Sequence, residues 1–286
     1  MAAGPGCSGV TATRPRQDVA ERTSPAAVPW ALRGPAALAV LFLVLPLGAL
    51  LARAPWRGLP RLLADSNVAE ALRLSLLTAT AATLVSLLLG VPLAFVLARA
   101  QSRGVSLLRV LVTLPLVLPP VVGGVALLMA LGRRGVIGRP LEALTGLSLP
   151  FTPVAVVVAE TFVAMPFLVL TVEGAFRAAD RGLDEAAATL GASRLTIFRR
   201  VTLPLVLPSL AAGSVLCWAR ALGEFGATIT FAGNFPGRTQ TMPVAVYLAL
   251  ESDPEAAIAL SLVLLLVSVV VLALLRDKWL RPGSVL

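Results

Sequence analysis

Three ionisable side chains interrupt apolar segments that are long enough to cross a membrane. Glu160 lies inside one such segment, and Arg220 and Glu224 lie four residues apart in another. An ionisable group at the centre of a membrane helix costs about 2.5–3.5 kcal/mol on insertion scales, and a partner four residues away can form an ion pair that lowers this cost. These residues therefore indicate either a charged path or gate through a membrane, or an ion pair that only stabilises a helix bundle. Glu160 could pair with Arg220 across helices or face a cavity.

Residues for enzymatic chemistry are scarce. Histidine is absent, and Cys7 and Cys217 are the only cysteines. Two cysteines cannot build a disulfide framework or a metal cluster, and the sequence holds no G-x-x-x-x-G-K-[ST] loop for nucleotide phosphates. We therefore expect no catalytic residues, no metal site and no cofactor in this chain.

The composition indicates a membrane protein. Of 286 residues, 57% are hydrophobic and only 14% are charged. The apolar residues form long blocks, which is typical of spanning helices and not of a soluble domain. The formal net charge of +9 then fits basic residues at the ends of the spans, and we do not expect a nucleic-acid partner.

Six apolar blocks reach the length of about 20 residues that a spanning helix requires. The sequence thus predicts an all-α, polytopic fold with about six transmembrane helices. We expect the third block to be broken by Pro115, Pro119, Pro120 and the pair Gly123-Gly124. The six predicted spans are Gly34–Ala52, Leu74–Ala98, Val110–Gly132, Leu149–Val172, Thr202–Phe235 and Ala256–Leu275.

Orientation follows from lysine and arginine, which are commoner in cytoplasmic segments. If the N-terminus lies inside, the segments on the inner side carry more lysine and arginine residues than the segments on the outer side. We therefore expect both termini in the cytoplasm. The predicted organisation is a disordered N-terminal tail over residues 1–33, a transmembrane domain over 34–276 with a cytoplasmic loop at about 177–204, and a C-terminal tail over 277–286.

This loop joins the fourth and fifth predicted spans and contains a short helix pattern. Asp184 and Glu185 begin a run of helix formers, where their charges complement the helix dipole. Gly191 is placed to end the helix in a positive-φ turn, and Ser193 can cap a second helix with Leu195, Phe198 and Val201 on its apolar face. The small residues Ala186–Ala188 would let a partner approach closely. An amphipathic linker lying on the bilayer is the alternative interpretation.

The spacing in this loop resembles a known family signature. Glu185, Ala186, Ala187, Gly191, Val201, Leu203 and Pro204 fit the pattern E-A-A-x3-G-x9-[I/V]-x-L-P of the permease subunits of bacterial ABC importers. The resemblance implies a type I ABC importer permease fold, in which this loop, including Asp184, forms a coupling helix that fits a groove on the ATPase. Val201 stands where isoleucine is commoner, and the change keeps the apolar face.

Two further segments resemble the permeases for molybdate and sulfate. Residues 219–227 resemble the segment that lies there in the span after the coupling loop, so Glu160, Arg220, Gly223, Glu224 and Gly226 are candidates for a translocation path or gate. Residues 237–243 resemble an external G-x-T-x-T-x-P loop. There, Arg238, Thr239, Thr241 and Pro243 could assist an oxyanion, contact a binding protein, or simply form a well-made turn.

The resemblance implies an ATP-driven importer in the inner membrane that carries molybdate or tungstate. A sulfate or thiosulfate permease is the alternative, and a non-transporting scaffold or an ion-coupled transporter are alternatives of another class. The implied partners are a second copy of this chain, two ABC ATPase subunits that bind ATP and Mg²⁺, and a periplasmic or surface molybdate-binding protein.

Overall fold

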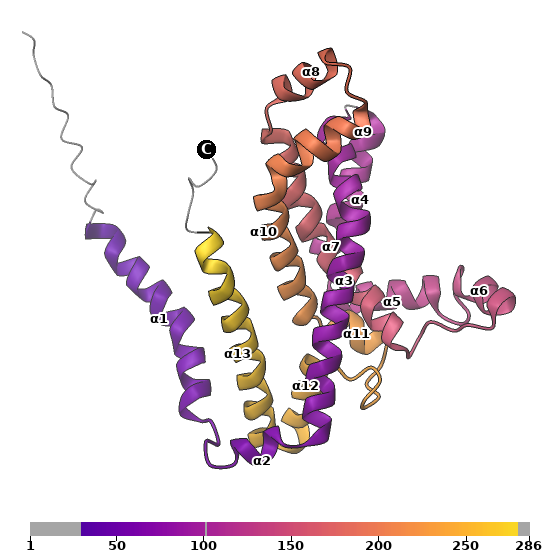
Figure 1. Ribbon diagram of the computed structural model, residues 1–286. Helices are drawn as coiled ribbons and strands as arrows, with labels where there is room; N and C mark the ends of the chain where they lie inside the picture. The colour runs from indigo at the N-terminus through magenta and orange to yellow at the C-terminus, as the bar shows by residue number, and fades with distance from the viewer. Residues whose placement is uncertain (1–29, 101, 280–286) are drawn as a thin grey trace, which may run out of the picture. The chain divides into compact units, whose positions relative to one another are not determined.

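The computed structural model describes residues 30–100 and 102–279, and this part of the chain is helical as predicted (Figure 1). The elements in order are α1 (Trp30–Ala52), α2 (Leu59–Leu63), α3 (Ser66–Arg99), α4 (Arg103–Val117), α5 (Pro120–Leu131), α6 (Gly138–Thr145), α7 (Pro153–Ala178), α8 (Arg181–Thr189), α9 (Arg194–Ile197), the π-helix η1 (Phe198–Thr202), α10 (Leu203–Leu222), α11 (Gly226–Phe231), α12 (Met242–Ser252) and α13 (Pro254–Trp279).

The two predicted tails lie largely outside the described residues. At their inner ends the boundaries differ, because Trp30–Arg33 belong to α1 and residues 277–279 belong to α13. Arginine is itself a good helix former, so the single charge at Arg33 does not end the helix.

The chain divides into two compact units, Met1–Ala49 and Leu50–Leu286. In the first unit, α1 is an apolar helix without a buried residue. Its hydrophobic length matches a membrane span, and a lipid environment accounts for apolar side chains that no protein surface covers.

In the second unit, α3, α7 and α10 form the central bundle. The buried face of α3 carries mostly small residues, which let helix backbones approach closely in a membrane. A Cβ added at Gly90 would lie 3.1 Å from Val169 Cγ2, and one added at Gly213 would lie 3.2 Å from Leu168 Cδ1. The buried small residues of α3 are Ala71, Ser75, Thr78, Ala79, Ala82, Thr83, Ser86, Gly90, Ala94 and Ala98.

The third predicted span is not one straight helix. α4 and α5 meet at an angle of 119° around Leu118 and Pro119. Pro119 and Pro120 have no N–H to continue the hydrogen-bond ladder, and Pro119 favours the extended backbone seen at Leu118. The prolines noted in the sequence therefore break this segment in two.

The fifth predicted span is shorter than expected. α10 ends at Leu222, and α11 begins a separate turn of helix at Gly226. Among the described residues, five single helices are long and apolar enough to cross a membrane, and the bent α4–α5 pair makes a sixth if it counts as one span.

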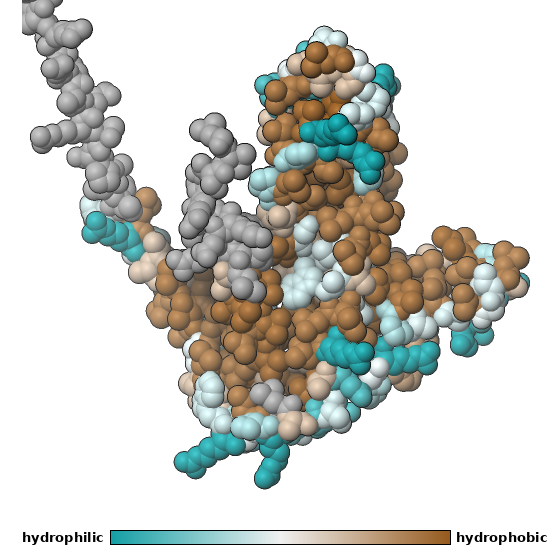
Figure 2. Space-filling model, in the orientation of Figure 1, coloured by the Kyte–Doolittle hydropathy of each residue, from teal (hydrophilic) through white to brown (hydrophobic). Residues whose placement is uncertain are grey.

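Several short helices of the second unit lie at the ends of its long helices. α8 and α9 lie at one end of α3, α7 and α10, whereas α2 and α12 lie at the other (Figure 1). Apolar side chains cover much of the visible surface between these ends (Figure 2). The loop around α8 is therefore separated by the length of the bundle from the loop at residues 237–243 that is predicted to be external.

Candidate functional site

The loop between α7 and α10 presents an exposed short helix. Asp180 caps the start of α8 by accepting a hydrogen bond from the Gly182 N–H at 2.8 Å. None of the described residues of α8 is buried, and Glu185 and Ala186 are exposed. Leu190, directly after the helix, is 89% exposed. A single exposed leucine is common on a surface, so the feature that leaves α8 available to another molecule is the exposure of the whole helix.

Gly191 ends α8 in the predicted positive-φ turn, with φ of 81°. Its N–H donates to Ala188 O at 3.0 Å, and the Ala192 N–H donates to Ala187 O at 3.2 Å. These two bonds form the Schellman arrangement, which satisfies the free carbonyls at the end of a helix. Nothing lies within 4 Å of a Cβ added at Gly191, so the backbone conformation alone favours glycine here.

Asp184 fastens α8 to the bundle. One carboxylate oxygen pairs with Arg99 at the end of α3, and the other accepts a hydrogen bond from Thr202 Oγ1 at 2.9 Å. Thr202 is buried at the end of η1. The two neighbouring acids therefore differ in role: Asp184 points to this protein's own bundle, whereas Glu185 is left exposed.

The returning half of the loop packs firmly on the bundle. The Phe198 ring lies 4.9 Å from the Phe95 ring and 6.2 Å from the Phe176 ring, centroid to centroid. Ser193 caps the helix as predicted, by accepting from the Thr196 N–H at 3.3 Å. Leu203 packs against the core of α3, α7 and α10, and Pro204 is exposed.

The predicted second helix is present, and it runs on without a break through η1 into α10. In the π-helix, the Leu203 N–H donates to Phe198 O instead of taking an α-helical partner. Pro204 follows directly and has no N–H to donate, which favours such a local change in the hydrogen-bond pattern.

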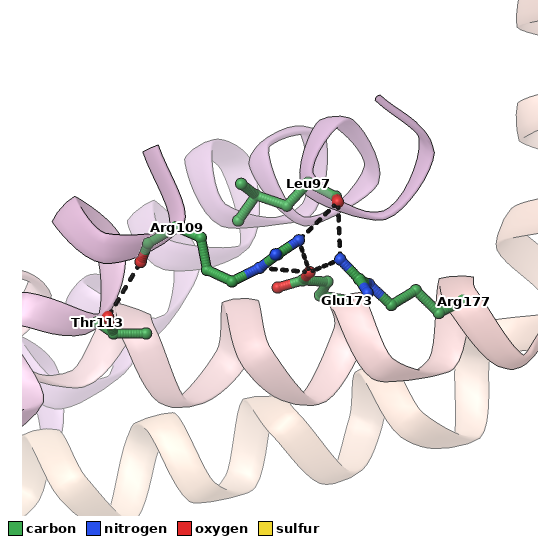
Figure 3. A network of polar contacts seen from close by, with 5 residues as sticks. All are labelled: Leu97, Arg109, Thr113, Glu173 and Arg177. Carbon is green, nitrogen blue, oxygen red and sulfur yellow. Dashed lines mark hydrogen bonds and ion pairs between the residues drawn. The ribbon is translucent and has the colours of Figure 1, made fainter. Parts of the chain in front are cut away.

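A second polar cluster fixes the end of α3 close to this loop (Figure 3). Glu173 Oε1 accepts from Arg109 Nη2 and pairs with Arg177 Nη2, both at 2.8 Å. Both arginines also donate to Leu97 O, at 3.1 and 3.3 Å. The cluster thereby joins α4 and α7 to the last turn of α3.

The predicted ion pair at the end of α10 is confirmed. Arg220 Nη1 lies 2.7 Å from Glu224 Oε2, and Glu224 Oε1 accepts from the Ala227 N–H at 2.9 Å. Glu224 is 1% exposed, whereas the Arg220 side chain is 28% exposed. Glu224 is thus satisfied on both oxygens, and Arg220 is the member of the pair that another molecule can reach.

Glu160 lies apart from this pair. It is buried in α7, where Oε1 accepts from Thr78 Oγ1 of α3 at 2.9 Å. Oε2 has no hydrogen-bond partner among the described residues, and the ion pairs of that part of the chain do not join Glu160 to Arg220. The sequence left two arrangements open for Glu160, an ion pair with Arg220 across helices or a position facing a cavity. The structure does not contain the ion pair.

The glycines around the ion pair have different surroundings. Gly223 is exposed at the end of α10. Gly226 is buried at the start of α11, where an added Cβ would lie 2.8 Å from Pro120 Cβ. On the facing helix, a Cβ at Gly124 would lie 2.9 Å from Ala227 Cα. α11 and α5 therefore pack backbone to backbone.

The loop predicted to be external buries both of its threonine side chains. Thr239 is buried, and its Oγ1 accepts from the Phe235 N–H at 3.0 Å, while Thr241 is buried ahead of α12. Pro243 lies in the first turn of α12. Arg238 is exposed and is therefore the only one of the four predicted loop residues available to a partner or a passing anion.

The structure brings Asp184, Gly191 and Leu203 into one loop, and Arg220, Glu224 and Gly226 into one segment. Sequence reasoning missed Arg99, Thr202 and the cluster around Glu173 as site residues. For Glu173 and Arg177 there was a signal, since they lie four residues apart at the end of a span. Arg99 and Arg109 are among the basic residues on which the predicted orientation of the spans rests.

Comparison with protein families and known proteins gives consistent matches. The family described as "Binding-protein-dependent transport system inner membrane component" matches residues 90–282. The molybdenum transport system permease protein ModB of Mycobacterium tuberculosis is 52% identical over 237 residues, which are 83% of this chain and 89% of that protein. The protein of the same name from Escherichia coli is 41% identical over 215 residues, covering 75% and 94%.

Solved structures share the fold at low sequence identity. A bacterial ABC transporter involved in the import of the acidic polysaccharide alginate has a chain that matches with a TM-score of 0.67 and 19% identity, covering 87% of this chain and 92% of that one. An inward-facing MetNI methionine ABC transporter matches with a TM-score of 0.55 and 18% identity, covering 75% and 99%. The helix arrangement is thus that of ABC transporter membrane subunits.

Proposed function

The chain belongs to the family of binding-protein-dependent transport system inner membrane components, and on that premise we propose that it is the permease subunit of an ATP-driven molybdate importer. The observation that carries the proposal is α8, an exposed helix with the family's E-A-A and glycine spacing, set at one end of a membrane bundle. The chain supplies the membrane path, and it contributes no catalytic residue to ATP hydrolysis.

Molybdate is preferred to sulfate as the cargo. Relatives named as molybdenum transport permeases cover most of this chain at 41–52% identity. We infer that tungstate, an oxyanion of similar size and charge, remains a second cargo for the same path.

The assembly that this function requires is larger than one chain. We propose a dimer of permease subunits, two ABC ATPase subunits that bind ATP and Mg²⁺, and a molybdate-binding protein on the outer side. The exposed Glu185, Ala186 and Leu190 support the ATPase contact, because small and apolar residues on a projecting helix suit a groove. Arg238 is the exposed cation that the external loop offers to the binding protein or the oxyanion.

Within the membrane, Arg220 is the side chain placed to meet an oxyanion. It is partly exposed and carries the positive charge that a dianion needs, whereas Glu224 would repel it. While no anion is present, Glu224 neutralises Arg220 at low cost because both carboxylate oxygens are satisfied. Glu224 therefore acts as a gate partner and not as a ligand.

The proposed orientation places α8 and both termini in the cytoplasm. Cysteine labelling in sealed cells tests it, with Cys7 and Cys217 replaced. An impermeant reagent should label cysteine at Gly237 or Ser252 and should leave cysteine at Ser193 unlabelled. Labelling at Ser193 alone would reverse the orientation.

Transport by the reconstituted complex tests the function itself. Liposomes with the binding protein outside, and with the ATPase side of the complex and ATP inside, should accumulate molybdate in preference to sulfate, and they should do so only when ATP is present. Preferential sulfate uptake would support the alternative permease, and uptake that continues without ATP would indicate an ion-coupled transporter.

A further inference from the structure

The last turn of α3 connects α8 to the rest of the bundle. On one side, Arg99 pairs with Asp184 of α8. On the other side, Leu97 O accepts hydrogen bonds from Arg109 of α4 and Arg177 of α7 (Figure 3). Leu97 and Arg99 lie two residues apart on one helix, so their contacts bring α3, α4, α7 and α8 together.

The attachment of α8 depends on few contacts. None of the described residues of α8 is buried, so apolar packing contributes little to its position. Its side-chain bonds to the bundle converge on the Asp184 carboxylate, which binds Arg99 and Thr202. Asp184 therefore determines whether α8 moves together with the bundle or independently of it.

The end of α3, by contrast, is firmly held. Glu173 is buried and binds both Arg109 and Arg177, which fixes the two guanidinium groups on the free carbonyl of Leu97. Cations at the C-terminal end of a helix also interact favourably with its dipole. A displacement of Arg99 thus shifts α3 together with α4 and α7, because these helices share one bonded cluster.

We propose that the Arg99–Asp184 ion pair transmits the movement of α8 to α3, with Arg99 and Asp184 as positioning residues for coupling. The inference rests on the proposed function, in which an ATPase moves α8. The pair is partly exposed at both ends, so it can adjust during the movement without leaving a buried charge unpaired. Phe198 holds the returning half of the loop by packing, so without the pair α8 is free to pivot between Asp180 and Gly191.

The ratio of molybdate imported to ATP hydrolysed tests this role. In Arg99→Ala, the ATPase still binds the exposed face of α8 and still hydrolyses ATP, but the ratio should fall about fivefold or more, the lower end of a typical coupling between sites. Arg99→Lys keeps the charge and should retain most of the ratio. Arg103→Ala, which removes an exposed arginine four positions along the chain, is the matched control and should not change it.

Exchanging the two charges distinguishes an ion pair that transmits the movement of α8 from one that only stabilises the fold. Arg99→Asp and Asp184→Arg should each uncouple the complex, and the double variant should recover the ratio. Membrane abundance and ATPase co-purification are measured in every variant. An unchanged ratio in Arg99→Ala, or an equal loss in Arg103→Ala, would overturn the proposal.

A distance measurement gives a readout that needs no molybdate. Spin labels at Thr189→Cys in α8 and Ser106→Cys in α4, with Cys7 and Cys217 replaced by alanine, should keep one narrow distance distribution with and without an ATP analogue. In Arg99→Ala the distribution should broaden. If the wild-type complex imports no molybdate, the proposed function fails, but this measurement still decides the inference: equal widths in wild type and variant would contradict it.

Discussion

The two candidate regions of the molecule are built in opposite ways. Helix α8 is exposed and is fastened to the bundle mainly through the Asp184 carboxylate. The segment around Glu224 is buried, and α11 touches α5 so closely that added Cβ atoms at Gly226 or Gly124 would collide with the facing helix. Helix α8 can therefore move without repacking of the core, whereas the segment around Glu224 cannot.

This difference assigns the two regions to different tasks. A surface that another protein must reach and displace needs exposed contacts and few internal ones. A charged segment inside a membrane needs every polar group satisfied, which Glu224 achieves through Arg220 and the Ala227 N–H. Substitutions should therefore act on coupling in the loop and on folding or on the path in the buried segment.

The largest effect is expected at Arg220. Arg220→Ala leaves the buried Glu224 without its cation, and breaking a buried pair costs about 3–5 kcal/mol. Molybdate uptake per folded complex should fall far more than in Arg238→Ala, which removes an exposed arginine of the external loop. Both variants are measured in the same liposome assay.

The double variant Arg220→Ala, Glu224→Ala then distinguishes structure from transport. Recovery of uptake would mean that the pair only stabilises the bundle. Persistent loss with normal abundance would support a role for Arg220 in the path. Full activity in Arg220→Ala alone would remove this segment from the mechanism.

A slightly smaller effect is expected at Gly124. Its Cβ in Gly124→Ala would lie 2.0 Å from Thr230 Oγ1 and 2.9 Å from backbone atoms of Ala227, and overpacking typically costs about 1–3 kcal/mol. The amount of folded protein in the membrane and its melting temperature should drop. Gly174→Ala on α7 is the control, since nothing lies within 4 Å of its added Cβ. Equal stability in the two variants would contradict the close contact of α5 and α11.

Local patterns in the sequence predicted much of both regions. The positive φ of Gly191, the Ser193 cap and the Arg220–Glu224 pair each involve residues within four positions of one another, where helix geometry alone determines the contact. The number of apolar blocks likewise predicted the all-helical membrane fold.

Contacts between distant residues could not be predicted in this way. Arg99 and Asp184 are 85 positions apart, and Thr78 and Glu160 are 82 apart, so only the packing of α3 against α7 and α8 brings them together. The prolines predicted that the third span is broken but not the angle of the bend, and the π-helix η1 within the continuous helix was not predicted. Small residues recur along α3, and this pattern in the sequence indicates the face on which other helices approach closely.

In the loop, Gly191→Val should uncouple transport at a moderate cost. A residue with a Cβ loses roughly 1–2 kcal/mol in the left-handed conformation, so the turn after α8 should distort. ATPase co-purification should fall while the protein stays in the membrane. Gly191→Asn is the control, since asparagine tolerates this conformation, and it should retain the ATPase. Loss in both variants would mean that the backbone conformation is not what matters at this position.

The smallest effect is expected at Glu185. Glu185→Lys reverses a charge in the first half of α8, which costs about 0.3–1 kcal/mol through the helix dipole and leaves the fold intact. Because Glu185 is exposed, the main consequence should be weaker ATPase binding. Binding of the purified ATPase to the detergent-solubilised permease measures this. Unchanged affinity would place Glu185 outside the contact.

Cross-linking tests most directly whether α8 is the ATPase contact. A photoreactive amino acid is placed at Leu190, which is 89% exposed beside α8, or at Leu144, which is 85% exposed in α6. In the purified complex, the probe at Leu190 should form a covalent product with the ATPase subunit, and the equally exposed probe at Leu144 should not. A product from Leu144 and none from Leu190 would contradict the account.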